Sequence, residues 1–150
     1  GAALKQALAC GVPLALIKPN RDELQTLLGR PLPTCADLRE AARGLHAQGV
    51  ETVVVSLGAQ GAFMSSPEGA WLAAPLPVKP VSTVGAGDAQ VAGLLAARHA
   101  GLGWQEALRY GVAFATAKLG LAGADSMERQ TISALENKVE ISEMIETARP

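Results

Sequence analysis

The chain has 150 residues, 49% of them hydrophobic and 18% charged, and its formal net charge is −1. This length and apolar content allow one domain with a sizeable core and exclude an intrinsically disordered chain. Because the charge is near neutral, without a basic cluster, we expect no nucleic-acid partner. The apolar stretches are too short for a membrane span and no secretory leader is present, so we expect no membrane partner and a cytoplasmic location.

The cysteines and histidines predict no metal site and no disulfide framework. Cys10 and Cys35 do not form a C-x-x-C pair, which favours two reduced thiols. His46 and His99 fall within helical patterns that offer no second metal ligand. We therefore expect both histidines to be structural or surface residues.

The predicted elements alternate between helices and strands along the chain. Helices are expected over 2–10, 20–28, 35–48, 87–99 and 104–119, and strands over 14–17 and 51–56. Short strand-like pieces at 62–64, 71–73 and 76–79, interrupted by prolines, predict an antiparallel edge meander. The segment 131–146 predicts a short helix and a final strand. This order is typical of a doubly wound α/β fold.

Apolar periodicity predicts which side chains face the core. The expected buried positions are Leu24, Leu27, Leu28, Leu38, Ala42, Leu45, Val91, Leu94, Leu95, Leu108, Val112, Ala115, Leu119, Val139 and Ile141.

The most informative stretch is Ser82-Thr83-Val84-Gly85-Ala86-Gly87-Asp88. Gly85 and Gly87 let backbone N–H groups approach a ligand closely, and the helix expected to follow points its positive dipole end at the same place. The pattern favours an anion site. Asp88 in the first turn would stay ionised and could accept a proton from an attacking hydroxyl. An ordinary tight turn with a helix-start acid is the alternative.

A second stretch follows the strand at 14–17 and reads Lys18-Pro19-Asn20-Arg21-Asp22-Glu23. Asn20 and Glu23 are one helical turn apart, near the carboxyl end of a strand, where open α/β sheets bind ligands. The same spacing is that of a capping box, and both functions can coexist.

A third stretch follows the strand at 51–56. Ser56 ends that strand, and Gly58 and Gly61 lie in the turn before the next predicted strand. Two glycines after a strand are most often only a turn, so this pattern alone is weak.

Taken together, the three stretches resemble the ribokinase-like (PfkB) carbohydrate kinase family, whose signature D/S-T-x-G-A-G-D opens a helix. The resemblance implies a three-layer α/β/α fold, of which residues 1–150 would form the C-terminal, nucleotide-binding part of a single domain. Family members run to about twice this length, so we expect a fragment without the sugar-binding half and lid. The residues that select the sugar would then lie outside the chain, and a homodimer of the longer parent remains open.

The resemblance also implies roles for individual residues, ATP as phosphoryl donor and magnesium as cofactor. Asp88 would be the catalytic base, and the amides of Gly85, Ala86 and Gly87 would form the anion hole. The nucleotide would be bound by Lys18, Asn20, Ser56, Gly58 and Gly61. Glu23 would act on magnesium through water. Ala89 and Gln90 depart from the family pattern, which often has Ser and then Phe or Met after the acid.

Many members of the family have aspartate where this chain has Ser82. Serine at this position resembles the branch of the family that phosphorylates sugar phosphates. The motifs look most like the 1-phosphofructokinase and tagatose-6-phosphate kinase branch, which implies conversion of fructose 1-phosphate to fructose 1,6-bisphosphate. Tagatose 6-phosphate, fructose 6-phosphate and ribose are alternative acceptors.

Two other classes of protein stay open at this point. One is a catalytically silent ATP-binding or regulatory module. The other is a dinucleotide-dependent oxidoreductase, which Gly85-Ala86-Gly87 suggests but Gln90 opposes, because a G-x-G-x-x-G fingerprint requires glycine there.

Overall fold

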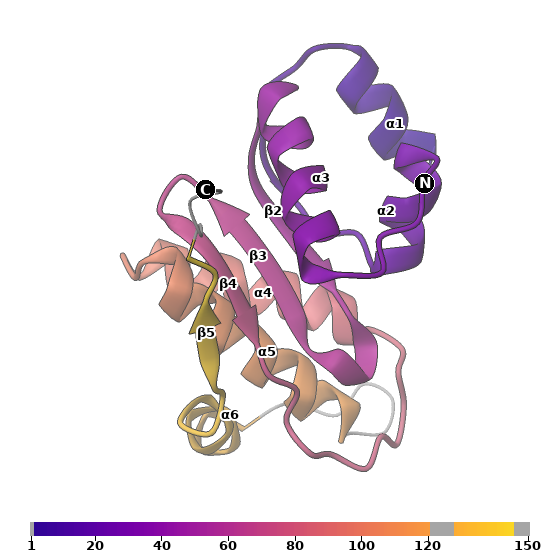
Figure 1. Cartoon of the computed structure of the whole chain (residues 1–150). Helices are drawn as coiled ribbons and strands as arrows, with labels where there is room; N and C mark the ends of the chain where they lie inside the picture. Colours follow the sequence, from indigo (N-terminus) through magenta and orange to yellow (C-terminus); the bar gives the residue numbers. More distant parts are fainter. Residues whose placement is uncertain (1, 121–127, 146–150) are drawn as a thin grey trace. The chain divides into compact units, whose positions relative to one another are not determined.

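A computed structural model describes residues 2–120 and 128–145, which contain both helices and strands (Figure 1). The elements are α1 (Ala2–Ala9), β1 (Leu14–Ile17), α2 (Arg21–Leu28), α3 (Cys35–Ala47), β2 (Val50–Ser56), the 3₁₀ turn η1 (Gly58–Gln60), β3 (Ala62–Ser66), β4 (Gly69–Ala73), α4 (Ala86–His99), α5 (Trp104–Leu119), α6 (Arg129–Glu136) and β5 (Ile141–Glu143).

One predicted element is wrong. The segment 76–79 forms no strand, and the chain between β4 and α4 is irregular. Pro75, Pro77 and Pro80 explain the difference, since proline has no N–H to donate to a neighbouring strand.

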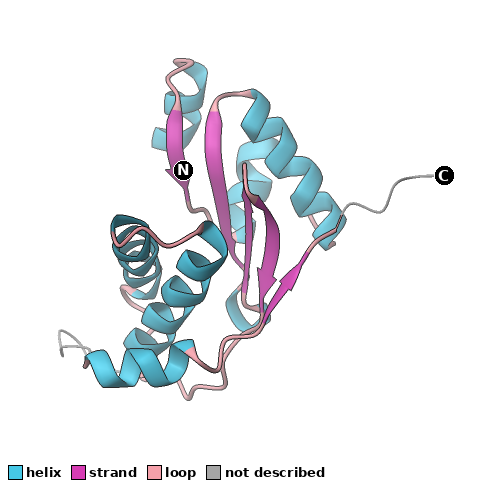
Figure 2. Ribbon diagram, turned by 90° about the vertical axis from the view of Figure 1, so that its left-hand side faces the viewer, coloured by secondary structure: helices cyan, strands magenta, loops and turns pink. Residues whose placement is uncertain are grey.

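The strands form one mixed sheet in the order β1-β2-β3-β4-β5 (Figure 2). β1 and β2 run parallel, with Leu16 opposite Thr52, and β2 and β3 run antiparallel, with Val54 opposite Met64. A two-residue turn joins β3 to β4 as a hairpin. The sheet confirms the predicted α/β class. Two pieces of the predicted antiparallel meander form β3 and β4, but they are not at the edge of the sheet, because β5 lies beyond β4.

The chain divides into two compact units, which we describe separately. The first contains 1–58, 62–72 and 143–150, and the second contains 59–61 and 73–142.

In the first unit, α2 and α3 pack against β2. Leu24, Leu38 and Leu45 have no exposed surface, and they belong to the same core as Val53 and Phe63. The predicted core faces of α2 and α3 are therefore confirmed. Burying one such leucine side chain contributes about 1.5–3 kcal/mol.

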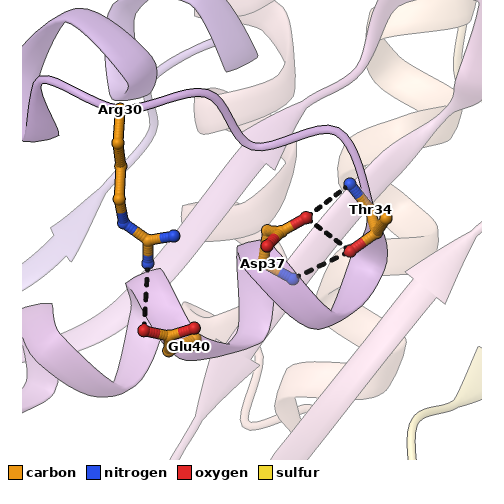
Figure 3. A network of polar contacts seen from close by, with 4 residues as sticks. All are labelled: Arg30, Thr34, Asp37 and Glu40. Carbon is orange, nitrogen blue, oxygen red and sulfur yellow. Dashed lines mark hydrogen bonds and ion pairs between the residues drawn. The ribbon is translucent and has the colours of Figure 1, made fainter.

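A network of polar contacts fixes the start of α3 (Figure 3). Thr34 is the N-cap, and its hydroxyl accepts a hydrogen bond from Asp37 N (3.2 Å). The Asp37 carboxylate accepts in return from Thr34 N (2.9 Å) and from the Thr34 hydroxyl (2.5 Å). An ion pair joins Arg30 and Glu40 nearby (3.4 Å). Two of the otherwise unsatisfied N–H groups at this helix start are thus paired.

In the second unit, α4 and α5 lie side by side and α6 packs against α5. Gly93 and Gly111 meet where α4 and α5 cross, because a Cβ on Gly93 would lie only 2.9 Å from Gly111 Cα. Leu94 is fully buried, but Leu95, which we expected in the core, is 52% exposed. The buried stripe of α4 passes through Gln90, Gly93 and Ala97 instead, and Leu95 lies about 100° around the helix from Leu94.

The other apolar positions of this unit that we expected to be buried are buried or half-buried in the structure. Leu108, Val112 and Val139 are buried, whereas Ala115, Leu119 and Ile141 are half-buried.

Candidate functional site

The carboxyl ends of the parallel strands β1 and β2 bring two of the predicted motifs together. Ser56 N donates to Pro19 O (3.1 Å), and Asn20, just after β1, forms an isolated parallel bridge with Ser56, the last residue of β2. Lys18 is half-buried at the end of β1, and Asn20 is exposed. Predicted nucleotide-binding residues from two distant stretches are therefore neighbours at the edge where open α/β sheets bind ligands.

Asn20 and Glu23 form the capping box that their spacing predicts. Asn20 Oδ1 accepts from Glu23 N (2.8 Å), and Glu23 Oε2 accepts from Asn20 N (2.9 Å). Both side chains are exposed, so their role in the cap leaves them accessible to solvent. The structural interpretation of this motif is confirmed, and the metal and nucleotide roles of these residues remain predictions.

The two glycines after β2 both adopt the left-handed conformation, with φ of +57° at Gly58 and +91° at Gly61. Gly58 has open space where a side chain would lie, which keeps its backbone accessible. A Cβ on Gly61 would lie 2.0 Å from Ala73 O. Close packing against β4 is thus a sufficient reason for glycine at 61.

The start of α4 has the geometry expected for an anion site. Gly85 is the N-cap, with φ of +79° and no side-chain cap, and Ala89 N makes the first intrahelical bond to Gly85 O (2.9 Å). The amides of Gly87 and Asp88 precede that bond and have no intrahelical acceptor. Asp88 lies in the first turn with its side chain exposed. Helix dipole and amide groups therefore favour negative charge at this position.

Bonds within the loop and to the end of α5 hold the segment before α4. Val84 N donates to the Ser82 hydroxyl (3.2 Å), and the carbonyl of Leu119 accepts from Val81 N (2.7 Å) and Ser82 N (3.4 Å). Lys118 precedes Leu119, and its Cε would lie 3.5 Å from a methyl group placed on Gly85. Sequence reasoning missed Lys118, because no motif marks it and 33 residues separate it from Gly85.

Among residues 2–120 and 128–145, no group of three or more His, Cys, Asp or Glu side chains could hold a metal ion. Magnesium usually keeps several waters and binds one or two carboxylates together with substrate phosphates, so its binding does not require such a group. Glu23 is an exposed carboxylate at the strand ends and could contribute in that way. In the same part of the chain, no helix is long and apolar enough to cross a membrane.

Each predicted site residue falls in one of the two units. Lys18, Asn20, Glu23, Ser56 and Gly58 belong to the first unit. The second unit holds Gly61 and 85–88, which are the loop glycine and the start of α4. His46 bonds to Val50 O and the Ser65 hydroxyl (both 2.8 Å), which confirms its predicted structural role.

The mixed sheet with its packed helices defines an α/β protein, and sequence comparison places it more narrowly. The model of the pfkB family of carbohydrate kinases matches residues 4–131. The chain is 45% identical to 1-phosphofructokinase of Haloferax volcanii over 125 residues, covering 83% of this chain and 41% of that protein. It is 41% identical to 1-phosphofructokinase of Escherichia coli over 143 residues, covering 91% of this chain and 45% of that protein. The chain therefore belongs to the pfkB family of carbohydrate kinases.

Solved structures agree with this assignment and define the fold as ribokinase-like. Phosphofructokinase-2 from Escherichia coli in complex with potassium has a TM-score of 0.82 and 36% identity, covering 92% of this chain and 45% of that one. Arabidopsis thaliana ribokinase complexed with ribose and ATP has a TM-score of 0.74 and 28% identity, covering 81% of this chain and 40% of that one. The chain thus spans less than half the length of the relatives it matches.

Proposed function

We propose that this protein transfers the γ-phosphoryl group of ATP to a sugar phosphate, with fructose 1-phosphate as acceptor and fructose 1,6-bisphosphate as product. The observation that carries the proposal is Asp88 in the first turn of a helix that Gly85 opens in a left-handed conformation. The names of the two curated relatives support the choice of acceptor. Phosphoryl transfer needs chiefly positioning and charge stabilisation, which amides and a helix start can supply.

In the proposed step, an Asp88 carboxylate oxygen accepts the proton of the sugar hydroxyl as the hydroxyl oxygen bonds to the γ-phosphorus. The bond between that phosphorus and the oxygen bridging to the β-phosphate breaks, and ADP leaves with that oxygen. The amides of Gly85, Ala86 and Gly87 stabilise the charge on the transferring group, for which Ala86 N exchanges its long bond to Thr83 O (3.4 Å) for a phosphate oxygen. Asp88 is exposed, so a substrate hydroxyl can reach it.

Residues at the ends of β1 and β2 serve the nucleotide in this proposal. The Lys18 ammonium attracts phosphate oxygens, and Asn20 and Ser56 offer polar side chains beside it. Gly58 and Gly61 place no side chain at two positions of the loop after β2. Magnesium, when bound, neutralises phosphate charge, and Glu23 would hold its water ligands.

The substitution Asp88→Asn tests the proposed base. Turnover in the complete gene product should fall by about 10²- to 10⁴-fold, because an amide cannot take the hydroxyl proton. ATP affinity, measured by calorimetry, should stay within a few-fold of the unsubstituted protein.

The control variant is Glu106→Gln. Glu106 is also an acid in the first turn of a helix, where it pairs with Arg109 (3.3 Å). Turnover should survive this change. If Asp88→Asn also retains normal turnover, Asp88 is an ordinary helix-start residue and the proposed mechanism is wrong.

The acceptor is tested by measuring ADP formation with fructose 1-phosphate, fructose 6-phosphate, tagatose 6-phosphate and ribose in parallel. The highest kcat/KM should belong to fructose 1-phosphate. Saturable MgATP binding without ADP formation from any of the four would indicate a nucleotide-binding module instead of a kinase.

A further inference from the structure

Lys118 lies beside the proposed anion site, although it is 30 residues beyond the motif that forms that site. A methyl group placed on Gly85 would meet one atom within 4 Å among the described residues, and that atom is Lys118 Cε at 3.5 Å. The ammonium nitrogen is one bond beyond Cε. The side chain of Lys118 therefore brings a positive charge to the backbone at the N-cap of α4.

The position of Lys118 is fixed by its backbone. It belongs to the last turn of α5, and the carbonyl of the next residue, Leu119, accepts from both Val81 N and Ser82 N. Gly120 continues this contact, since a Cβ there would lie 3.9 Å from Val78 Cγ2. The loop that leads into α4 is thus bonded to the segment that carries Lys118, which holds the backbone of Lys118 close to that loop.

A cation at this place suits phosphoryl transfer. The transferring group carries spread negative charge on its equatorial oxygens, and fixed positive groups stabilise that charge. Amides at a helix start supply partial charges only, whereas a lysine ammonium supplies a full charge that is compact and strongly hydrated. Glycine at 85 is favoured by its left-handed conformation, and the lysine stem lies at ordinary van der Waals distance from a Cβ placed there.

From this juxtaposition we infer that Lys118 is a further phosphate-binding residue, which contacts the phosphoryl group as it is transferred at the start of α4. The inference rests on the proposed kinase function. Its alternative is purely structural, because a lysine in the last turn of a helix also stabilises the carbonyl end of that helix.

The test replaces Lys118 in the complete gene product by methionine, which keeps the length of the stem and removes the charge, and by arginine, which keeps a charge. Lys138→Met is the matched control, since Lys138 is exposed and outside the loop before α4. Three quantities are measured: kcat and KM with ATP and sugar phosphate, the melting temperature, and the affinity for ADP with and without aluminium fluoride, which mimics the phosphoryl group in transfer.

We expect Lys118→Met to lower kcat by about 10²-fold, the effect of losing one group aimed at the transition state. The gain in ADP affinity that aluminium fluoride produces should fall by a similar factor, while the affinity for ADP alone changes little. Lys118→Arg should recover part of both losses, and Lys138→Met should behave like the unsubstituted protein. If Lys118→Met does not fold, Lys118→Gln gives the same comparison with a polar side chain.

A lowered melting temperature with unchanged kcat and unchanged response to aluminium fluoride would overturn the inference and leave the helix-end role. That result would not touch the proposed function, because the unsubstituted protein would still phosphorylate its acceptor. An unsubstituted protein that forms no ADP with any acceptor would contradict the proposed function itself, and the inference with it.

Discussion

Gly58 and Gly61 both adopt positive φ, yet their surroundings differ. A side chain at 58 would meet open space, whereas a Cβ at 61 would overlap Ala73 O at 2.0 Å. We therefore expect Gly61→Ala to destabilise the protein by several kcal/mol, since backbone has to move, and Gly58→Ala to cost only about 1–2 kcal/mol for its left-handed conformation. Thermal unfolding of the two variants measures the difference. Equal losses would contradict the close approach of Gly61 to β4.

Asp37 provides a prediction about pH. The hydrogen bonds from the Thr34 hydroxyl and from Thr34 N, with a smaller contribution from Arg30, hold the pKa of Asp37 below its ordinary value of 3.8. Because the folded pKa is lowered, the ionised carboxylate stabilises α3 above the unfolded pKa, and this stabilisation is lost as the pH falls through the lowered folded pKa.

Titration of the Asp37 carboxyl by NMR checks this account. Thr34→Ala should move the pKa of Asp37 upward toward 3.8, because it removes the largest cause of the shift. Arg30→Gln should move it less. A larger change with Arg30→Gln than with Thr34→Ala would contradict the order of the causes.

At the scale of helices, replacing glycine by alanine where α4 and α5 cross should have the opposite of its usual effect on stability. Replacing glycine by alanine inside a helix normally stabilises it by about 1 kcal/mol. Gly93→Ala should instead destabilise the protein by about 1–3 kcal/mol, because its Cβ would lie 2.9 Å from Gly111 Cα and 3.0 Å from Phe114 Cβ. Gly44→Ala in α3 is the control, since Gly44 is exposed with nothing within 4 Å.

Chemical denaturation of both variants measures these free energies of unfolding. Gly44→Ala should raise stability while Gly93→Ala lowers it. A stabilising Gly93→Ala would mean that the two helices can separate at little cost.

The features that the sequence predicted well depend on neighbours in the chain. The capping box of Asn20 and Glu23 and the glycine-opened start of α4 are local, so spacing alone predicts them. The prediction that Leu95 is buried is wrong because apolar periodicity allows the buried stripe of α4 to extend to either side of Leu94. Only the packing of α4 against α5 decides which side is buried. Lys118 could not be predicted, because its place beside Gly85 depends on how α5 ends against a distant loop.

At the scale of the whole chain, the candidate residues follow the division into two units. The ends of β1 and β2 bring Lys18, Asn20 and Ser56 together in the first unit, and Asp88 belongs to the second. Three motifs in family order predicted the family correctly, because each motif is weak alone but their order along one chain is specific. The roles of these residues are proposals, which experiments such as the turnover of the Asp88→Asn variant test.

The carbonyl of Leu119 accepts hydrogen bonds from Val81 N and Ser82 N. These bonds limit where residues can be inserted into or deleted from this part of the chain. These bonds close a loop that contains the signature and all of α4 and α5. One residue inserted in the last turns of α5 would rotate Leu119 by about 100° and turn its carbonyl away from the loop. Insertions and deletions should therefore be tolerated at the turn 100–103 between α4 and α5, which is exposed, and rejected in the second half of α5.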